Sequence, residues 1–292
     1  MPTATTEVGE SGGLLLVDKP AGITSHDVVA IVRRSLHTKK AGHTGTLDPF
    51  ATGLMLVLLG RGTRLIQYVE QEPKVYEATI RFGKETDTDD LTGSVTRSAP
   101  LPSDMAVDDA IVQLSGRIEQ MPPDFSAKQV DGKRAYAAAR RGAPLELRPV
   151  VVNVNAWQVL AREPDTLVAR ITCGGGTYIR ALARDLGRLA GTAAHLAQLR
   201  RTAAGPFSVV HAATLEDIQH GVATPLPLAA AVPSLPVQRL GDDELQRVVH
   251  GNAVAPRTAA PRVALVGHDD SLIAVAEAED GELRPRLVLR DG

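Results

Sequence analysis

The sequence has a single cysteine, Cys173, among 292 residues. One thiol cannot form a disulfide within the chain, so a fold held together by internal disulfides is excluded. Long apolar runs are also missing, because the longest fall far short of the ~20 residues that a membrane-spanning helix needs. Residues 1–13 lack the basic start and apolar centre of a signal peptide. We therefore expect a soluble cytoplasmic protein in which residues 1–13 form a disordered tail.

Motifs for metals and nucleotides are missing as well. The eight histidines are scattered, and they form no cluster with Cys, Asp or Glu at metal-ligand spacing. Glycines at 174–176 lie between a predicted strand and a predicted helix, but their spacing does not match the dinucleotide fingerprint, and no P-loop lysine follows them. This stretch therefore gives no reason to expect a bound nucleotide.

Net charge is small, −2, but it is unevenly distributed. Residues 122–201 carry 13 Lys and Arg against 6 Asp and Glu, whereas residues 240–292 carry 6 against 10. A polyanion such as RNA is therefore expected to meet the middle of the chain.

Hydrophobic residues make up 43% of the chain, which is long enough for one large domain and one small one. Apolar periodicity predicts several strands and helices between residues 14 and 190, and a small β domain after a Pro/Ala-rich linker at 225–236. The predicted strands are 14–18, 54–59, 74–82, 150–160, 166–172, 262–266, 272–276 and 286–289. The predicted helices are 25–36 with a cationic end at 37–40, 63–69, 103–114, 177–190 and 244–249. The acidic loop 85–90 is expected to be solvated.

Residues 42–59, GHTGTLDPFATGLMLVLL, place one carboxylate, Asp48, between a Gly/Thr-rich approach and an apolar strand. Three glycines and Pro49 favour a tight, well-anchored turn around it. A simpler interpretation is a helix start, because Asp often caps a helix and Pro often occupies its first position.

Strict alternation over residues 74–82 places Tyr76 on the inward face of a strand. Taken alone, this favours a core tyrosine over a functional one. Arg180, in the first turn of a predicted helix, either faces an anion or pairs with a structural acid. Residues 122–149 carry six cations against three acids, so they form either a solvated basic face or an arm that grips RNA.

Five ordered motifs together resemble the TruB family of tRNA pseudouridine synthases. They are DKPAGITS at 18–25, GHTGTLDPFATGLM at 42–55, KVYEATIRFG at 74–83, PPDFSAKQVDGKRAYAAAR at 122–140, and CGGGTYIRALARDLG from 173 followed by HLAQLRRTAAGPF from 195. The resemblance implies an α+β pseudouridine synthase fold, with a central mixed, largely antiparallel sheet and a small C-terminal PUA-like β domain. It places the catalytic domain at 14–232, with an RNA-gripping insertion at 122–149, and the C-terminal domain at 233–292.

By the same resemblance, the protein is expected to isomerise uridine 55 in the T loop of tRNA without metal or other cofactor, as a monomer with no membrane partner. Asp48 is then the catalytic carboxylate, and Arg180 keeps it ionised. His43 supports base flipping, and Tyr76 stacks on the flipped uracil, where its hydroxyl assists proton removal. The substrate site also includes Tyr178 and Leu199, with Lys19 in a supporting place.

Two other functions compete with this one. A tRNA-folding chaperone needs only the basic arm and the C-terminal domain, and it is compatible with enzyme activity. A glycoside hydrolase needs a second carboxylate, and no motif-bearing loop places one near Asp48 in sequence. The residues leave the chemical route open between ribose attack or elimination and addition to the uracil ring.

Overall fold

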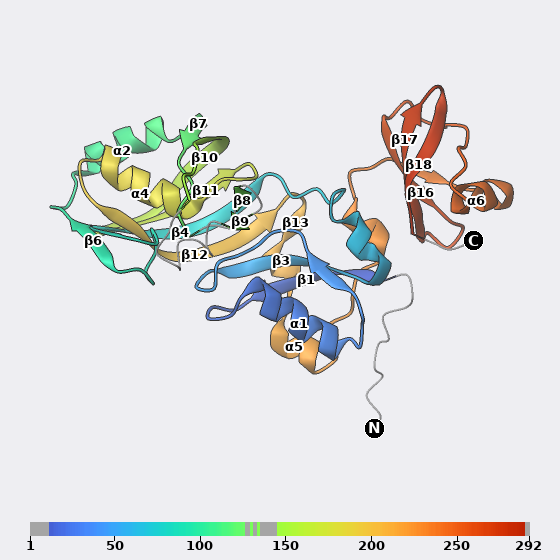
Figure 1. Cartoon of the computed structure of the whole chain (residues 1–292), viewed down its shortest axis with the longest axis horizontal. Helices are drawn as coiled ribbons and strands as arrows, with labels where there is room; N and C mark the ends of the chain where they lie inside the picture. The colour runs from blue at the N-terminus through green and yellow to red at the C-terminus, as the bar shows by residue number, and fades with distance from the viewer. Residues whose placement is uncertain (1–11, 126–128, 131–132, 135–144, 290–292) are drawn as a thin grey trace. The chain divides into compact units, whose positions relative to one another are not determined.

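The computed structural model describes residues 12–125, 129–130, 133–134 and 145–289. The tail expected at 1–13 therefore lies almost wholly outside the described residues, as does most of the basic segment 122–149. The chain divides into two compact units, residues 1–71 with 206–292 and residues 72–205. Each is described by itself below, with element labels as in Figure 1.

The first unit contains a mixed sheet around β1 (Gly13–Lys19) and β3 (Thr52–Leu59). These strands are antiparallel along their full length, from Gly13 opposite Leu59 to Lys19 opposite Gly53. On its other side β1 pairs in parallel with β14 (Ala213–Thr214), and β2 (Ala41–His43) pairs antiparallel with β3. The predicted strands at 14–18 and 54–59 are therefore confirmed.

Helices α1 (Ser25–Ser35) and α5 (Leu215–Gln219) lie side by side in the first unit (Figure 1). Thr24 caps α1 together with the carboxylate of Asp27, as the sequence predicts. The predicted helix at 63–69 is wrong, because the chain forms the 3-10 helix η1 (Gly60–Leu65) there. The 3-10 helix ends at Leu65 and the chain continues as a turn over 66–68, so no α-helix forms at 63–69.

After residue 206 the first unit continues into a four-stranded sheet, in the order β15 (Val237–Arg239), β16 (Arg262–Val266), β17 (Leu272–Glu279) and β18 (Glu282–Val288). Helix α6 (Asp242–Val249) packs against it. The strands expected at 262–266 and 272–276 are therefore confirmed, whereas the strand expected at 286–289 begins earlier, at Glu282. Residues 225–236, however, are not an open linker, since they include the 3-10 helix η3 (Leu228–Ala231) and bury Leu228, Ala231 and Val232.

The second unit is built on an antiparallel sheet in the order β12 (Ala194–Ala204), β4 (Lys74–Phe82), β11 (Thr166–Cys173), β10 (Val150–Glu163) and β7 (Gly116–Gln120). Helices α2 (Asp104–Gln113) and α4 (Ile179–Leu189) pack together, with α4 against β12 (Figure 1). Two hairpins complete the unit, β5 (Lys84–Thr86) with β6 (Val95–Ser98) and β8 (Gln129–Val130) with β9 (Lys133–Arg134). The α+β class with mixed, largely antiparallel sheets is confirmed.

Candidate functional site

Asp48 lies in a tight turn that leads directly into β3. The amide of Ala51 donates to the Asp48 carbonyl at 3.1 Å, and the Pro49 carbonyl accepts from the Gly22 amide at 2.8 Å. No helix begins at Pro49, so the helix-start interpretation is wrong. The side chain of Asp48 is partly exposed.

Lys19 contacts this turn through hydrogen bonds to its backbone. Its side chain is fully buried, and its ammonium group donates to the carbonyls of Pro20 at 2.9 Å, Pro49 at 3.2 Å and Ala51 at 2.7 Å. Burial lowers the pKa of Lys19 to about 8, while the nearby charge of Asp48 opposes this shift. An ammonium group has three donors, and in Lys19 all three bond to backbone carbonyls. Lys19 therefore stabilises the Asp48 turn and is not placed to bind a ligand.

A second support for the turn comes from α1. The hydroxyl of Ser25 donates to the Leu47 carbonyl at 3.0 Å and accepts from the Leu47 amide at 2.9 Å. Ser25 is buried, and these bonds fix the residue that precedes Asp48. This role of Ser25 is not visible in the sequence, although Ser25 closes the DKPAGITS motif. His43, on β2, lies edge-on to the His26 ring with centroids 5.9 Å apart.

Tyr76 and Leu199 lie on neighbouring strands of the second unit. Alternation along β4 buries Tyr76, Ala78, Ile80 and Phe82, as predicted. Leu199 is opposite Ala78 in the register of β4 and β12, so it shares the face that carries Tyr76. Arg201 is directly opposite Tyr76 and almost fully buried. It was missed as a candidate, although its position two residues after Leu199 places it on the same face.

Tyr178 is the N-cap residue of α4. Its amide donates to the Gln120 side-chain oxygen at 2.8 Å, and its carbonyl accepts from the Gln120 side-chain nitrogen at 3.1 Å. Gln120 is fully buried at the end of β7 and therefore fixes the start of the helix. Sequence reasoning missed this contact, because the two residues are far apart in the chain.

Arg180 lies one residue inside α4 and is buried in the second unit. It donates to the Thr88 carbonyl at 3.0 Å and to the Phe125 carbonyl at 2.8 Å, and it lies 3.7 Å from the Asp90 carboxylate. Asp90 also accepts from the hydroxyl of Thr88 at 2.8 Å. Arg180 therefore does lie near a buried acid, as one of the two interpretations of this residue expects.

The acidic loop at 85–90 is not solvated, which corrects the sequence prediction. Its residues Glu85, Asp89 and Asp90 are buried. Arg184 donates to Asp89 at 2.8 Å, and Arg188 donates to Glu85 at 3.0 Å. Residues four apart share one face of a helix, so α4 presents a row of guanidinium groups to this loop and compensates the burial of its carboxylates.

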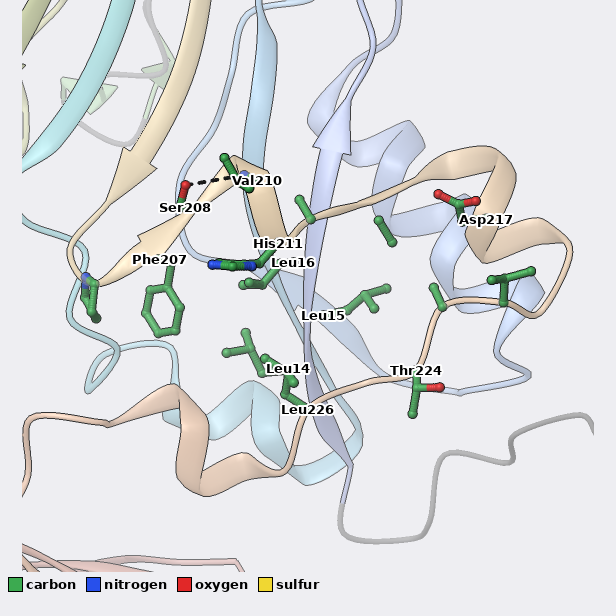
Figure 2. Close-up of a pocket in the computed structure, with 15 residues that line it drawn as sticks. Leu14, Leu15, Leu16, Phe207, Ser208, Val210, His211, Asp217, Thr224 and Leu226 are labelled. Atoms are coloured by element: carbon green, nitrogen blue, oxygen red, sulfur yellow. Dashed lines mark hydrogen bonds between the residues drawn. The ribbon is translucent and has the colours of Figure 1, made fainter.

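A groove in the first unit contains none of the predicted site residues (Figure 2). It has a volume of about 730 Å³. It is lined by β1, by β13 (Phe207–Ser208), by the 3-10 helix η2 (Val209–His211) and by the chain around α5. Ser208 accepts a hydrogen bond from the Val210 amide at 3.3 Å, shown dashed in Figure 2. The remaining lining is mostly apolar.

Within the described ranges, no group of three or more His, Cys, Asp and Glu residues is arranged to hold a metal ion. None of the helices in the described part of the chain is long and apolar enough to cross a bilayer.

Comparison with known proteins gives consistent matches. A model of the N-terminal domain of TruB family pseudouridylate synthases matches residues 33–179, and a model of the tRNA pseudouridylate synthase B C-terminal domain matches residues 180–226. The chain is 45% identical to tRNA pseudouridine synthase B of Thermobifida fusca strain YX, over 94% of this chain and 98% of that protein. It is 41% identical to the protein of the same name from Mycobacteroides abscessus, over 95% and 96%.

Among solved structures, the chain is similar to one described as "Crystal Structure of a Cbf5-Nop10-Gar1 Complex". The TM-score is 0.71 at 26% identity, with 97% of this chain and 86% of that chain covered. The similarity extends over nearly the whole length of both chains.

Proposed function

Since the chain belongs to the TruB family of pseudouridylate synthases, we infer that it isomerises uridine 55 in the T loop of tRNA to pseudouridine. The reaction is an intramolecular transfer, so no atom is gained or lost. The N1–C1′ glycosidic bond breaks, the uracil turns, and C5 bonds to C1′. The proton on C5 leaves, and N1 carries a proton in the product.

We propose Asp48 as the catalytic carboxylate, acting as nucleophile or base at the ribose or the uracil. The observation that carries this assignment is the buried Lys19 ammonium held against the Asp48 turn by three carbonyls. Partial burial raises the pKa of a carboxyl group, and a nearby cation opposes that rise. Lys19 supplies one such charge, and we assign Arg180 as the second.

The remaining predicted residues are assigned to substrate handling. A stacked T-loop base has to leave the helix before it can react, which costs about a few kcal/mol. We assign His43 to the space that the base vacates and Tyr76 to the face of the flipped uracil, where its hydroxyl assists loss of the C5 proton. We assign Tyr178 and Leu199 to the walls of the pocket that would hold the flipped uracil.

The expected partner is the T arm of tRNA, bound by a cytoplasmic monomer. We propose a catalytic domain at 14–232, with the basic insertion 122–149 gripping RNA, and a C-terminal PUA-like domain at 233–292. The excess of cations over residues 122–201 supports RNA contact in the middle of the chain.

The same local charge favours a second function, a tRNA-folding chaperone, which needs binding but no chemistry. An Asp48→Asn protein is expected to speed the refolding of heat-melted tRNA as the wild type does. Native gel electrophoresis of the refolded tRNA measures this, and refolding at the rate of protein-free tRNA would remove the chaperone function alone.

The enzyme function is tested with purified protein and unmodified tRNA transcript, by carbodiimide labelling of pseudouridine and primer extension. The wild type is expected to produce one stop, immediately 3′ of position 55, that is missing from a transcript with cytidine at position 55. Transfer RNA from cells lacking the protein should likewise lack the modification. Unchanged uridine with the purified protein would contradict the proposal, and release of free uracil would indicate a glycoside hydrolase.

A further inference from the structure

Arg184 is a buried guanidinium for which neither the proposed function nor the family resemblance gives a role. It lies one helical turn after Arg180 on α4, so the two side chains lie on the same face of the helix. Its side chain is only 8% exposed. A buried charge has to be compensated by partners of good geometry, and the partners of Arg184 indicate what the residue does.

Three groups accept hydrogen bonds from Arg184. Nη1 donates to the carboxylate of Asp89 at 2.8 Å, Nη2 donates to the Met121 carbonyl at 2.9 Å, and Nε donates to the carboxylate of Asp185 at 2.9 Å. Asp185 follows Arg184 on α4, whereas Asp89 and Met121 belong to two other segments. Arg184 therefore ties both of those segments to the helix.

The same two segments supply the partners described for Arg180. Thr88 and Asp90 flank Asp89 in the chain, and Phe125 lies four residues after Met121. Moving Asp89 or Met121 away from α4 would therefore displace the carbonyls and the carboxylate that orient the Arg180 guanidinium.

The backbone at Asp89 needs such a restraint. Its φ of 60° lies in the left-handed region, which is unfavourable for most residues other than glycine. The turn is also fixed from its other side, because the Leu196 amide donates to the Asp89 carbonyl at 3.0 Å. The ion pair with Arg184 holds the side chain, and the contact with β12 holds the backbone.

We propose that Arg184 is a positioning residue for the reaction, which holds the 87–90 turn and the 121–125 segment against α4 so that Arg180 is correctly oriented. This inference rests on the proposed function of Arg180. It predicts that loss of Arg184 slows the chemical step while tRNA binding is retained.

Arg188 provides a matched control. It lies one turn further along the same helix and pairs with Glu85 of the same acidic loop, but its side chain is 53% exposed. None of the described partners of Arg180 flanks Glu85. Arg188→Gln therefore removes a guanidinium from the same row without releasing the contacts of Arg180.

The rate of pseudouridine formation in a single turnover, at saturating protein, distinguishes an effect on the chemical step from an effect on tRNA binding. Arg184→Gln is expected to lower it about tenfold to a hundredfold, since small displacements of a catalytic group have effects of this size. The tRNA Kd should stay within about threefold, and Arg184→Lys, which keeps the charge, should recover part of the rate. In an Arg180→Lys background the further loss from Arg184→Gln should be much smaller, because coupled residues are not additive.

Asp89→Asn serves as a second variant if Arg184→Gln folds poorly, because asparagine tolerates a positive φ. It also gives a pH readout. Burial raises the pKa of Asp89 to about 6 despite the facing guanidinium groups of Arg184, Arg180 and Arg188, and the Asp185 carboxylate adds to the rise. Below that pH the ion pair with Arg184 loses its charge, so the wild-type rate should fall relative to that of Asp89→Asn.

Wild-type rates in both Arg184→Gln and Asp89→Asn would overturn this inference and leave the proposed function intact. A loss confined to tRNA Kd, or an equal loss in Arg188→Gln, would also overturn it. A wild-type protein that makes no pseudouridine would overturn the proposed function together with the inference.

Discussion

Lys19 is a charged side chain with no exposed surface, which is costly unless its donors are satisfied. The carbonyl of Pro20 in the DKPAG turn and the carbonyls of Pro49 and Ala51 in the Asp48 turn accept these hydrogen bonds. At the scale of single residues, the structure therefore uses a buried cation to join the DKPAG turn to the Asp48 turn. The motif gave Lys19 a supporting place, but the sequence alone did not show that its charge is buried.

Lys19→Met is expected to abolish most turnover and to change the pH dependence of stability. Burial lowers the pKa of Lys19 from 10.5 to about 8, so the folded protein binds fewer protons than the unfolded chain between these values. Folding stability contributed by Lys19 therefore rises as pH increases through this window. Urea unfolding of both proteins from pH 7 to pH 10 measures the difference, and parallel curves would contradict the assignment.

Cys173 is expected to be chemically inert in the folded protein. Burial raises the pKa of its thiol to about 11, so almost no thiolate is present at neutral pH. An aromatic disulfide reagent should label it only after denaturation, at a rate set by unfolding. Rapid labelling of the native protein would show that β11 opens readily at this end.

At the scale of elements, the regular periodic segments were predictable and the irregular ones were not. Residues 74–82 alternate strictly, and β4 has those bounds. The acidic loop at 85–90 was wrongly predicted to be solvated, because a local charge pattern does not reveal a helix 90 or more residues later that presents Arg180, Arg184 and Arg188 to it. The helix expected at 63–69 is instead the end of a 3-10 helix followed by a turn.

The contact between α1 and the Asp48 turn gives a prediction at this scale. Ser25→Ala leaves the buried Leu47 amide and carbonyl without the hydroxyl that now bonds both, which costs about 1–3 kcal/mol. We expect a lower melting temperature and slower turnover with little change in tRNA affinity. Ser35→Ala, at the opposite end of the same helix, is the control and should resemble the wild type in all three measurements.

For the whole molecule, the order of the motifs identified the family and its α+β fold. The residues that hold the site in place were found only in the structure. Ser25, Gln120 and Arg184 each bond to a segment distant in the chain, and single-sequence patterns carry no signal for such pairs. The C-terminal strands were visible as short apolar runs between turn residues. Their packing on α6 and the burial within 225–236 depended on tertiary contacts.

We propose that one carboxylate, Asp48, performs the isomerisation. Single-turnover assay of Asp48→Asn with saturating tRNA, read as pseudouridine at position 55, tests it most directly. We expect no detectable product and a tRNA Kd within about threefold of wild type, because the amide keeps the shape of the side chain and loses its charge and basicity. Product formation at a rate near that of the wild type would contradict it.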